Sequence, residues 1–61
     1  MTQKELLYVE DAISHEQIII DELSIFIKEL SDSSYQDFIR DEIDIHLSLK
    51  NDLISLLKEE S

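Results

Sequence analysis

The 61-residue chain contains neither glycine nor proline, so no residue of these two types interrupts a regular backbone. Apolar residues recur at alternating spacings of three and four, which is the period of an amphipathic helix. One cluster of turn and cap residues breaks the pattern, Ser31-Asp32-Ser33-Ser34. The sequence therefore predicts an all-α fold with one domain, residues 1–61. Helices over about 3–30 and 34–59 are joined by a turn at 31–34 into an antiparallel hairpin.

Both helices have a predicted N-terminal signal. Thr2 and Glu5 have the spacing of a capping box, in which the hydroxyl and the carboxylate each accept a backbone N–H. Ser33 and Gln36 have a related spacing at the start of the second helix. We therefore expect Thr2 and Ser33 to cap the two helices.

Each helix carries a wide apolar stripe of the kind that faces a bundle core. The first contains Leu6, Val9, Ile13, Glu16, Ile20, Leu23, Ile27 and Leu30, flanked by Ala12, Ile19 and Phe26. The second contains Ile39, Glu42, His46, Leu49, Leu53 and Leu56, flanked by Tyr35, Phe38 and Ile45. Six further apolar residues lie outside these stripes and indicate an additional contact surface: Leu7, Ile18, Ile25, Ile43, Leu47 and Ile54.

Two helices share a single line of contact, so a lone hairpin leaves much of both stripes in water. Folds of this size usually need a disulfide, a metal or oligomerisation, and the chain has no cysteine. We therefore expect it to pair with itself, forming a homo-oligomeric four-helix bundle. Two hairpins related by a two-fold axis and packed antiparallel are the simplest such unit.

The charge balance is acidic, with 15 Asp and Glu residues against 5 Lys and Arg residues and a net charge of −10. Nucleic acids and anionic membranes are therefore not expected partners, since both require a basic surface. The longest apolar run, Leu6–Val9, is too short for a signal peptide or a membrane span, so a cytoplasmic location is expected. An acidic regulator that binds a basic protein also fits this charge.

Three polar residues stand within the two stripes: Glu16, Glu42 and His46. Burying a carboxylate is costly unless it is paired or bound to a cation, and the stripes contain no Lys or Arg. One interpretation is a polar layer that fixes the register of the helices, with His46 bonded to a glutamate. The other is a metal site.

All three residues lie near mid-height, so an antiparallel dimer would gather four glutamates and two histidines in one layer. This is the ligand set of di-iron and di-manganese bundles, which makes iron or manganese the expected metal. His15 and Glu10 flank the first stripe. They would contact the ligands from outside if a metal binds, and would otherwise be solvated rim residues.

Two segments resemble known families. The run Arg40-Asp41-Glu42-Ile43-Asp44-Ile45-His46 is similar to the acidic, histidine-ended run on a metal-binding helix of ferritin-like proteins, including encapsulated ferritins. Residues 4–17, KELLYVEDAISHEQ, resemble the start of short spore-coat-like proteins of spore-forming bacteria, which look like half of a ferritin-like bundle. This second resemblance implies a spore-associated location. The ferritin motif has glutamate three residues before histidine, where this chain has Ile43, so Glu42 stands four before His46.

The serines form no Ser/His/Asp arrangement and there is no glycine-rich loop, so hydrolase and nucleotide-binding functions are excluded. The favoured function is a self-associating structural or interaction module of the spore-coat-like kind. The alternative is a di-metal bundle, with ferroxidase-like chemistry as its only expected enzymatic activity. An acidic regulator is the third candidate.

Overall fold

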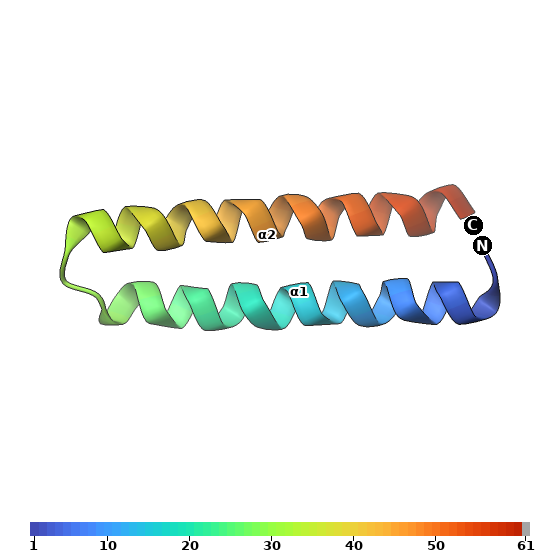
Figure 1. Cartoon of the computed structure of the whole chain (residues 1–61), viewed down its shortest axis with the longest axis horizontal. Helices are drawn as coiled ribbons and strands as arrows, with labels where there is room; N and C mark the ends of the chain where they lie inside the picture. The colour runs from blue at the N-terminus through green and yellow to red at the C-terminus, as the bar shows by residue number, and fades with distance from the viewer. Residues whose placement is uncertain (61) are drawn as a thin grey trace.

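The computed structural model describes residues 1–60, with side chains placed through Glu59. It consists of two long antiparallel helices, α1 (Gln3–Glu29) and α2 (Ser33–Glu60), lying side by side (Figure 1). The Cα trace extends 45 × 15 × 11 Å. No strand occurs between residues 1 and 60. The all-α prediction is confirmed, and both helix ends fall within one residue of the predicted bounds.

The start of α1 is capped as the sequence predicts. The backbone N–H of Thr2 donates to Glu5 Oε1 at 2.8 Å, and the backbone N–H of Glu5 donates to Thr2 Oγ1 at 3.1 Å. Hydrogen bonds from the Thr2 backbone, and then from its side chain, hold the pKa of Glu5 below its ordinary value. The reciprocal bonds satisfy two groups that the first helical turn leaves without partners.

The start of α2 is capped by Asp32, so the prediction of Ser33 as the cap is wrong. Asp32 Oδ1 accepts from the backbone N–H groups of Ser34 at 2.8 Å and Tyr35 at 3.4 Å. The Ser34 hydroxyl donates to the same oxygen at 2.5 Å. Ser34, followed by Tyr35, holds the pKa of Asp32 below its ordinary value. Gln36 turns back across the connection, and its Nε2 donates to the Leu30 carbonyl at 2.6 Å.

A seam of side chains fills the space between the helices. On the α1 side it contains every residue of the predicted first stripe, all half-buried except Ile20, which is buried. On the α2 side the seam consists of Gln36, Ile39, Ile43, His46, Lys50, Leu53 and Leu57, which are half-buried, and the half-buried residues Glu42 and Ile54 lie at its edges. The predicted stripe of the first helix is therefore confirmed, although its flanking residue Phe26 is exposed, whereas the prediction for the second helix is confirmed in part.

α2 is rotated about its axis relative to the prediction. Leu49 and Leu56 were expected to face the core, yet they are exposed, as are the flanking residues Phe38 and Ile45. Ile43 and Ile54, which were placed outside the stripe, are half-buried instead. The reason is that the apolar arc of α2 is wider than one neighbouring helix can cover. Contact with α1 covers one edge of the arc and leaves the other edge in water.

The hairpin has little interior. Ile20 is the only buried side chain within residues 1–59, while twelve large hydrophobic side chains in that range are exposed. The accessible surface is 4679 Å² for a 7.2 kDa chain. A folded monomer of this mass would expose roughly 4,100 Å². The chain thus presents more surface than a self-sufficient fold of its size. Neither described helix has the length and apolar character needed to cross a bilayer.

Candidate functional site

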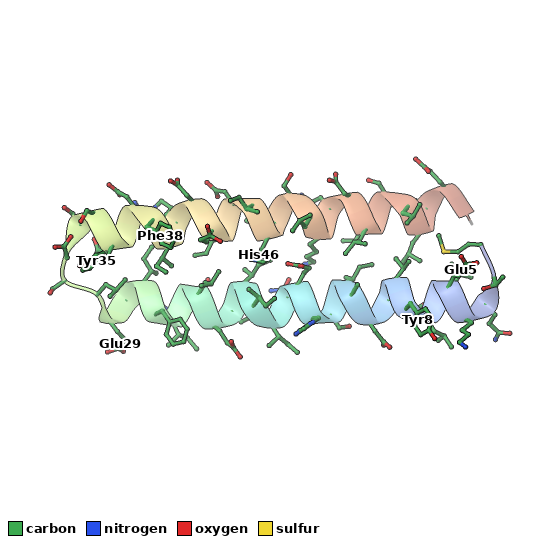
Figure 2. All side chains as sticks on the ribbon, viewed as in Figure 1. Glu5, Tyr8, Glu29, Tyr35, Phe38 and His46 are labelled. Atoms are coloured by element: carbon green, nitrogen blue, oxygen red, sulfur yellow. The ribbon has the colours of Figure 1, made fainter. Side chains whose placement is uncertain are left out.

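Glu16 and His46 meet in the middle of the seam. The Nδ1 atom of His46 lies 2.5 Å from Glu16 Oε2, and the two side chains are 23% and 18% exposed for His46 and Glu16 respectively. Figure 2 shows His46 directed from α2 into the space between the helices. An ionised carboxylate only accepts hydrogen bonds, so in that state the imidazole donates its Nδ1–H. The sequence-based interpretation that His46 is bonded to a glutamate is therefore confirmed for Glu16.

A second polar contact lies beside this pair. The Lys50 ammonium donates to Gln17 Oε1, and Gln17 Nε2 donates to Asp21 Oδ1 at 2.9 Å. Lys50 is half-buried in the seam, so the expectation that the core positions contain no lysine is wrong. Its position four residues after His46, in the series Ile43, His46, Lys50, carries the signal that could have revealed it. The long lysine stem can pack on apolar neighbours while its amine reaches a polar group.

Glu42 is the third residue of the predicted layer, and the structure does not join it to the other two. It is half-buried, one helical turn from His46. It forms no hydrogen bond or ion pair with His46 among the described residues. Glu42 directly precedes the seam residue Ile43, which places it at the edge of the seam.

The two expected outer partners lie on opposite sides of the hairpin. His15 precedes the seam residue Glu16, whereas Glu10 follows the seam residue Val9, and both are exposed. Positions before and after a seam residue project to opposite sides of a helix, since each step turns the direction by about 100°. His15 and Glu10 therefore cannot both lie against one group bound at Glu16.

Within residues 1–60 of a single chain, no group of three or more His, Asp or Glu side chains is placed to hold a metal ion. No pocket is found in that part of the chain either. The predicted metal layer needs ligands from two copies, so its test lies in the assembled protein. What one hairpin shows is a hydrogen-bonded carboxylate–imidazole pair that ties α1 to α2 at mid-height.

No protein-family model, curated protein or solved structure matches this chain.

Proposed function

We propose that this chain is a self-associating helical interaction module, whose hairpin is completed by contact with further copies of itself. Its task is structural: to present a defined helical surface and to hold neighbouring copies together. The Glu16–His46 pair sets the register of the two helices, and the exposed hydrophobic side chains supply the contact.

One observation carries this proposal. A single buried side chain, Ile20, stands against twelve exposed large hydrophobic ones among residues 1–59. Isolated exposed apolar residues are ordinary in soluble proteins, but contiguous apolar patches mark interaction sites. Burial of apolar surface is the main favourable term in folding, at about 25 cal/mol per Å². A second copy offers such burial without any other partner.

The Glu16–His46 pair supports the proposal through specificity. Sliding one helix by a turn would break the 2.5 Å contact and leave a half-buried carboxylate without a partner. Leucine or isoleucine at both positions would tolerate several registers, because apolar contact has no direction. A single polar pair in an otherwise apolar seam therefore selects one alignment, as a polar core residue does in coiled coils.

The resemblance of residues 4–17 to spore-coat-like proteins agrees with this proposal, because a coat component would be expected to assemble with its own kind. The ferritin-like resemblance of residues 40–46 agrees with a helical-bundle assembly. Both resemblances remain predictions.

The proposal is tested by the mass of the purified protein. Sedimentation equilibrium across micromolar to millimolar concentration should give a dimer or larger species, compared with 7.2 kDa for one chain. The melting temperature should rise with protein concentration, because association stabilises the folded state by mass action. A fully helical monomer with a melting temperature independent of concentration would contradict self-association.

A di-metal carboxylate bundle is the second candidate, favoured by the meeting of one carboxylate and one imidazole from different helices at the seam centre. Its ligands would be Glu16, Glu42 and His46 from two copies, with iron or manganese as the metal. Equilibrium dialysis against Fe(II) under anaerobic conditions, and against Mn(II), should then give at least one ion per dimer. The Glu16→Gln and His46→Gln variants should lose that ion. Less than one ion per dimer in the unmodified protein would exclude this candidate.

A further inference from the structure

The exposed hydrophobic side chains are unevenly distributed around the hairpin. In α1, the apolar residues that directly precede a seam residue are Tyr8, Ala12, Ile19 and Phe26. In α2 the apolar residues with the same offset are Tyr35, Phe38, Ile45, Leu49 and Leu56. The residues directly after seam positions are different. They are Leu7, Glu10, Ser14, Gln17, Asp21, Ser24 and Lys28 in α1, and Asp37, Arg40, Asp44, Leu47, Asn51, Ile54 and Lys58 in α2.

The same offset leads to the same side of the molecule in both helices. In an antiparallel hairpin, a half-turn about the axis normal to the plane of the two helices superimposes α1 on α2. This axis is the viewing axis of Figure 1. That rotation leaves each broad face on its own side. Positions before the seam therefore form one broad face of the hairpin, and positions after it form the other.

The two faces differ sharply in character. The apolar broad face consists of Tyr8, Ala12, Ile19, Phe26, Tyr35, Phe38, Ile45, Leu49 and Leu56, with Glu5, His15, Glu22, Glu42 and Asp52 interspersed. Tyr8, Phe26, Phe38 and Ile45 are 60%, 53%, 62% and 52% exposed. The opposite face, the polar broad face, has three apolar positions among the fourteen residues that follow the seam: Leu7, Leu47 and Ile54.

We infer that the apolar broad face of one hairpin packs against the same face of a second copy, forming a two-layer, four-helix dimer. This inference rests on the proposed function and names the surface through which self-association occurs. We take the partner to be a second copy, because only one of the two broad faces of the hairpin is apolar. Pairing two such faces about a two-fold axis encloses both and leaves the polar broad faces outside, so the contact closes at two copies.

The available area suits a stable dimer. The broad face spans 45 by 15 Å of Cα trace, a footprint of roughly 700 Å² before side chains extend it. A specific interface buries about 800 Å² on each partner. Aromatic side chains, which are enriched where interfaces hold most binding energy, lie toward both ends of the face: Tyr8 near one, Phe26 and Phe38 near the other.

A pair of isoleucines gives a closely matched test. Ile45 lies on the apolar broad face and is 52% exposed, while Ile18 lies on the outer edge of α1 and is 53% exposed. Both stand near mid-helix, and Ile→Lys at either position changes the net charge by the same amount, from −10 to −9. Because this change lowers the charge repulsion between copies, a loss of association cannot be attributed to repulsion.

The dimer dissociation constant of each variant would be measured by sedimentation equilibrium, with helicity followed by circular dichroism. Ile45→Lys should weaken the dimer by at least about 30-fold, the effect of losing a central contact. Ile18→Lys should stay within about three-fold of the unmodified chain. If both variants dimerise normally, or if only Ile18→Lys dissociates, the inferred face is wrong while self-association stands. A monomeric unmodified chain would instead overturn the proposed function.

Hydroxyl-radical footprinting of the unmodified chain tests whether the apolar broad face is the dimer interface, even if Ile45→Lys fails to fold. Phe26 and Phe38 should react several-fold more slowly at high protein concentration than at dilution, because the second copy shields them. Leu7, exposed away from this face, serves as the internal control and should react at the same rate in both samples. Equal protection of all three, or protection of Leu7 alone, would overturn the assignment.

Discussion

At the scale of single residues, Glu16 and His46 show how a polar pair can be specific without being strongly stabilising. Each side chain keeps about a fifth of its surface in water, at 18% for Glu16 and 23% for His46. Solvent therefore screens their attraction, and the cost of removing both groups from water offsets much of the gain. The pair should matter more for which alignment forms than for how firmly it forms.

Replacing both partners with leucine should therefore leave the free energy of unfolding unchanged or raise it by about 1 kcal/mol. Glu16→Leu alone should leave the oligomeric state intact. Urea denaturation followed by circular dichroism measures the first quantity, and sedimentation measures the second. A double variant less stable than the unmodified chain by more than about 1 kcal/mol would show that the pair contributes net stability.

Ile20 should be the most sensitive apolar position, because it is the one buried side chain of residues 1–59. Ile20→Ala should lower the free energy of unfolding by about 2–4 kcal/mol per chain, through lost burial and the cavity left behind. Ile18→Ala, two residues away and 53% exposed, should change it by less than about 0.5 kcal/mol. Similar losses for the two isoleucines would mean that Ile18 is also covered in the assembled protein.

At the scale of the helices, the two N-termini are held by carboxylates that must be ionised to act fully. The pKa values of Glu5 and Asp32 are both lowered by hydrogen bonds that the folded chain provides. A carboxylate whose pKa is lower in the folded state stabilises that state above its unfolded pKa, about 4. The contribution is lost as the pH falls through the folded value.

The variant Asp32→Asn tests whether the charge of the capping carboxylate stabilises the start of α2. The amide oxygen can still accept the N–H groups of Ser34 and Tyr35, but it carries no charge. The unmodified chain should melt higher than this variant at pH 7, and the difference should shrink as the pH falls below about 4. Asp32→Ala, which has no acceptor, should melt lower than both at pH 7. Thermal melts at several pH values provide the measurement, and a constant difference between Asp and Asn would contradict the role of charge.

The sequence predicted α1 closely and α2 less well, for a physical reason. In α1, each position after the seam from Glu10 to Lys28 is polar, so one edge of the apolar arc is sharply defined. In α2, apolar residues lie on both sides of the true seam line, and Lys50 stands on that line itself. The periodicity of apolar residues therefore predicts that the centre of the apolar arc of α2 faces α1, whereas in the structure α1 packs against one edge of that arc.

The candidate site shows the same limit. The sequence placed Glu16 and His46 in the middle of apolar stripes at matching height, but it left the partner of His46 open between Glu16 and Glu42. Glu42 was grouped with them by the spacing of four to His46, but the rotation of α2 moves it to the edge of the seam. Gln17 and Lys50 were missed because their contact depends on that rotation.

At the scale of the whole molecule, the direction of pairing can be argued from charge. Glu22 and Glu42 both lie on the apolar broad face, on the turn side of the Glu16–His46 pair. A parallel dimer would bring the four glutamates of two copies to one level. An antiparallel dimer would separate them to opposite sides of the two-fold axis, which lowers the repulsion. We therefore expect the antiparallel arrangement.

A spin label in the turn distinguishes the two directions. The chain has no native cysteine, so Ser31→Cys provides a single attachment site at the end of the hairpin. Pulsed electron resonance should give a distance near the 45 Å length of the molecule if the dimer is antiparallel, and a much shorter one if it is parallel. Ser48→Cys, near mid-helix, should give a short distance in either case and controls for the labelling.

The placement of the helix ends has a consequence for covalent fusion. α1 begins and α2 ends at the same end of the molecule, opposite the turn (Figure 1). A tandem gene fusion of two copies would therefore need only a short peptide if the copies were parallel. In the antiparallel dimer the joining peptide must travel the full 45 Å, or at least about 13 extended residues. The single-chain equivalent of this dimer would thus be a bundle with one long crossover connection.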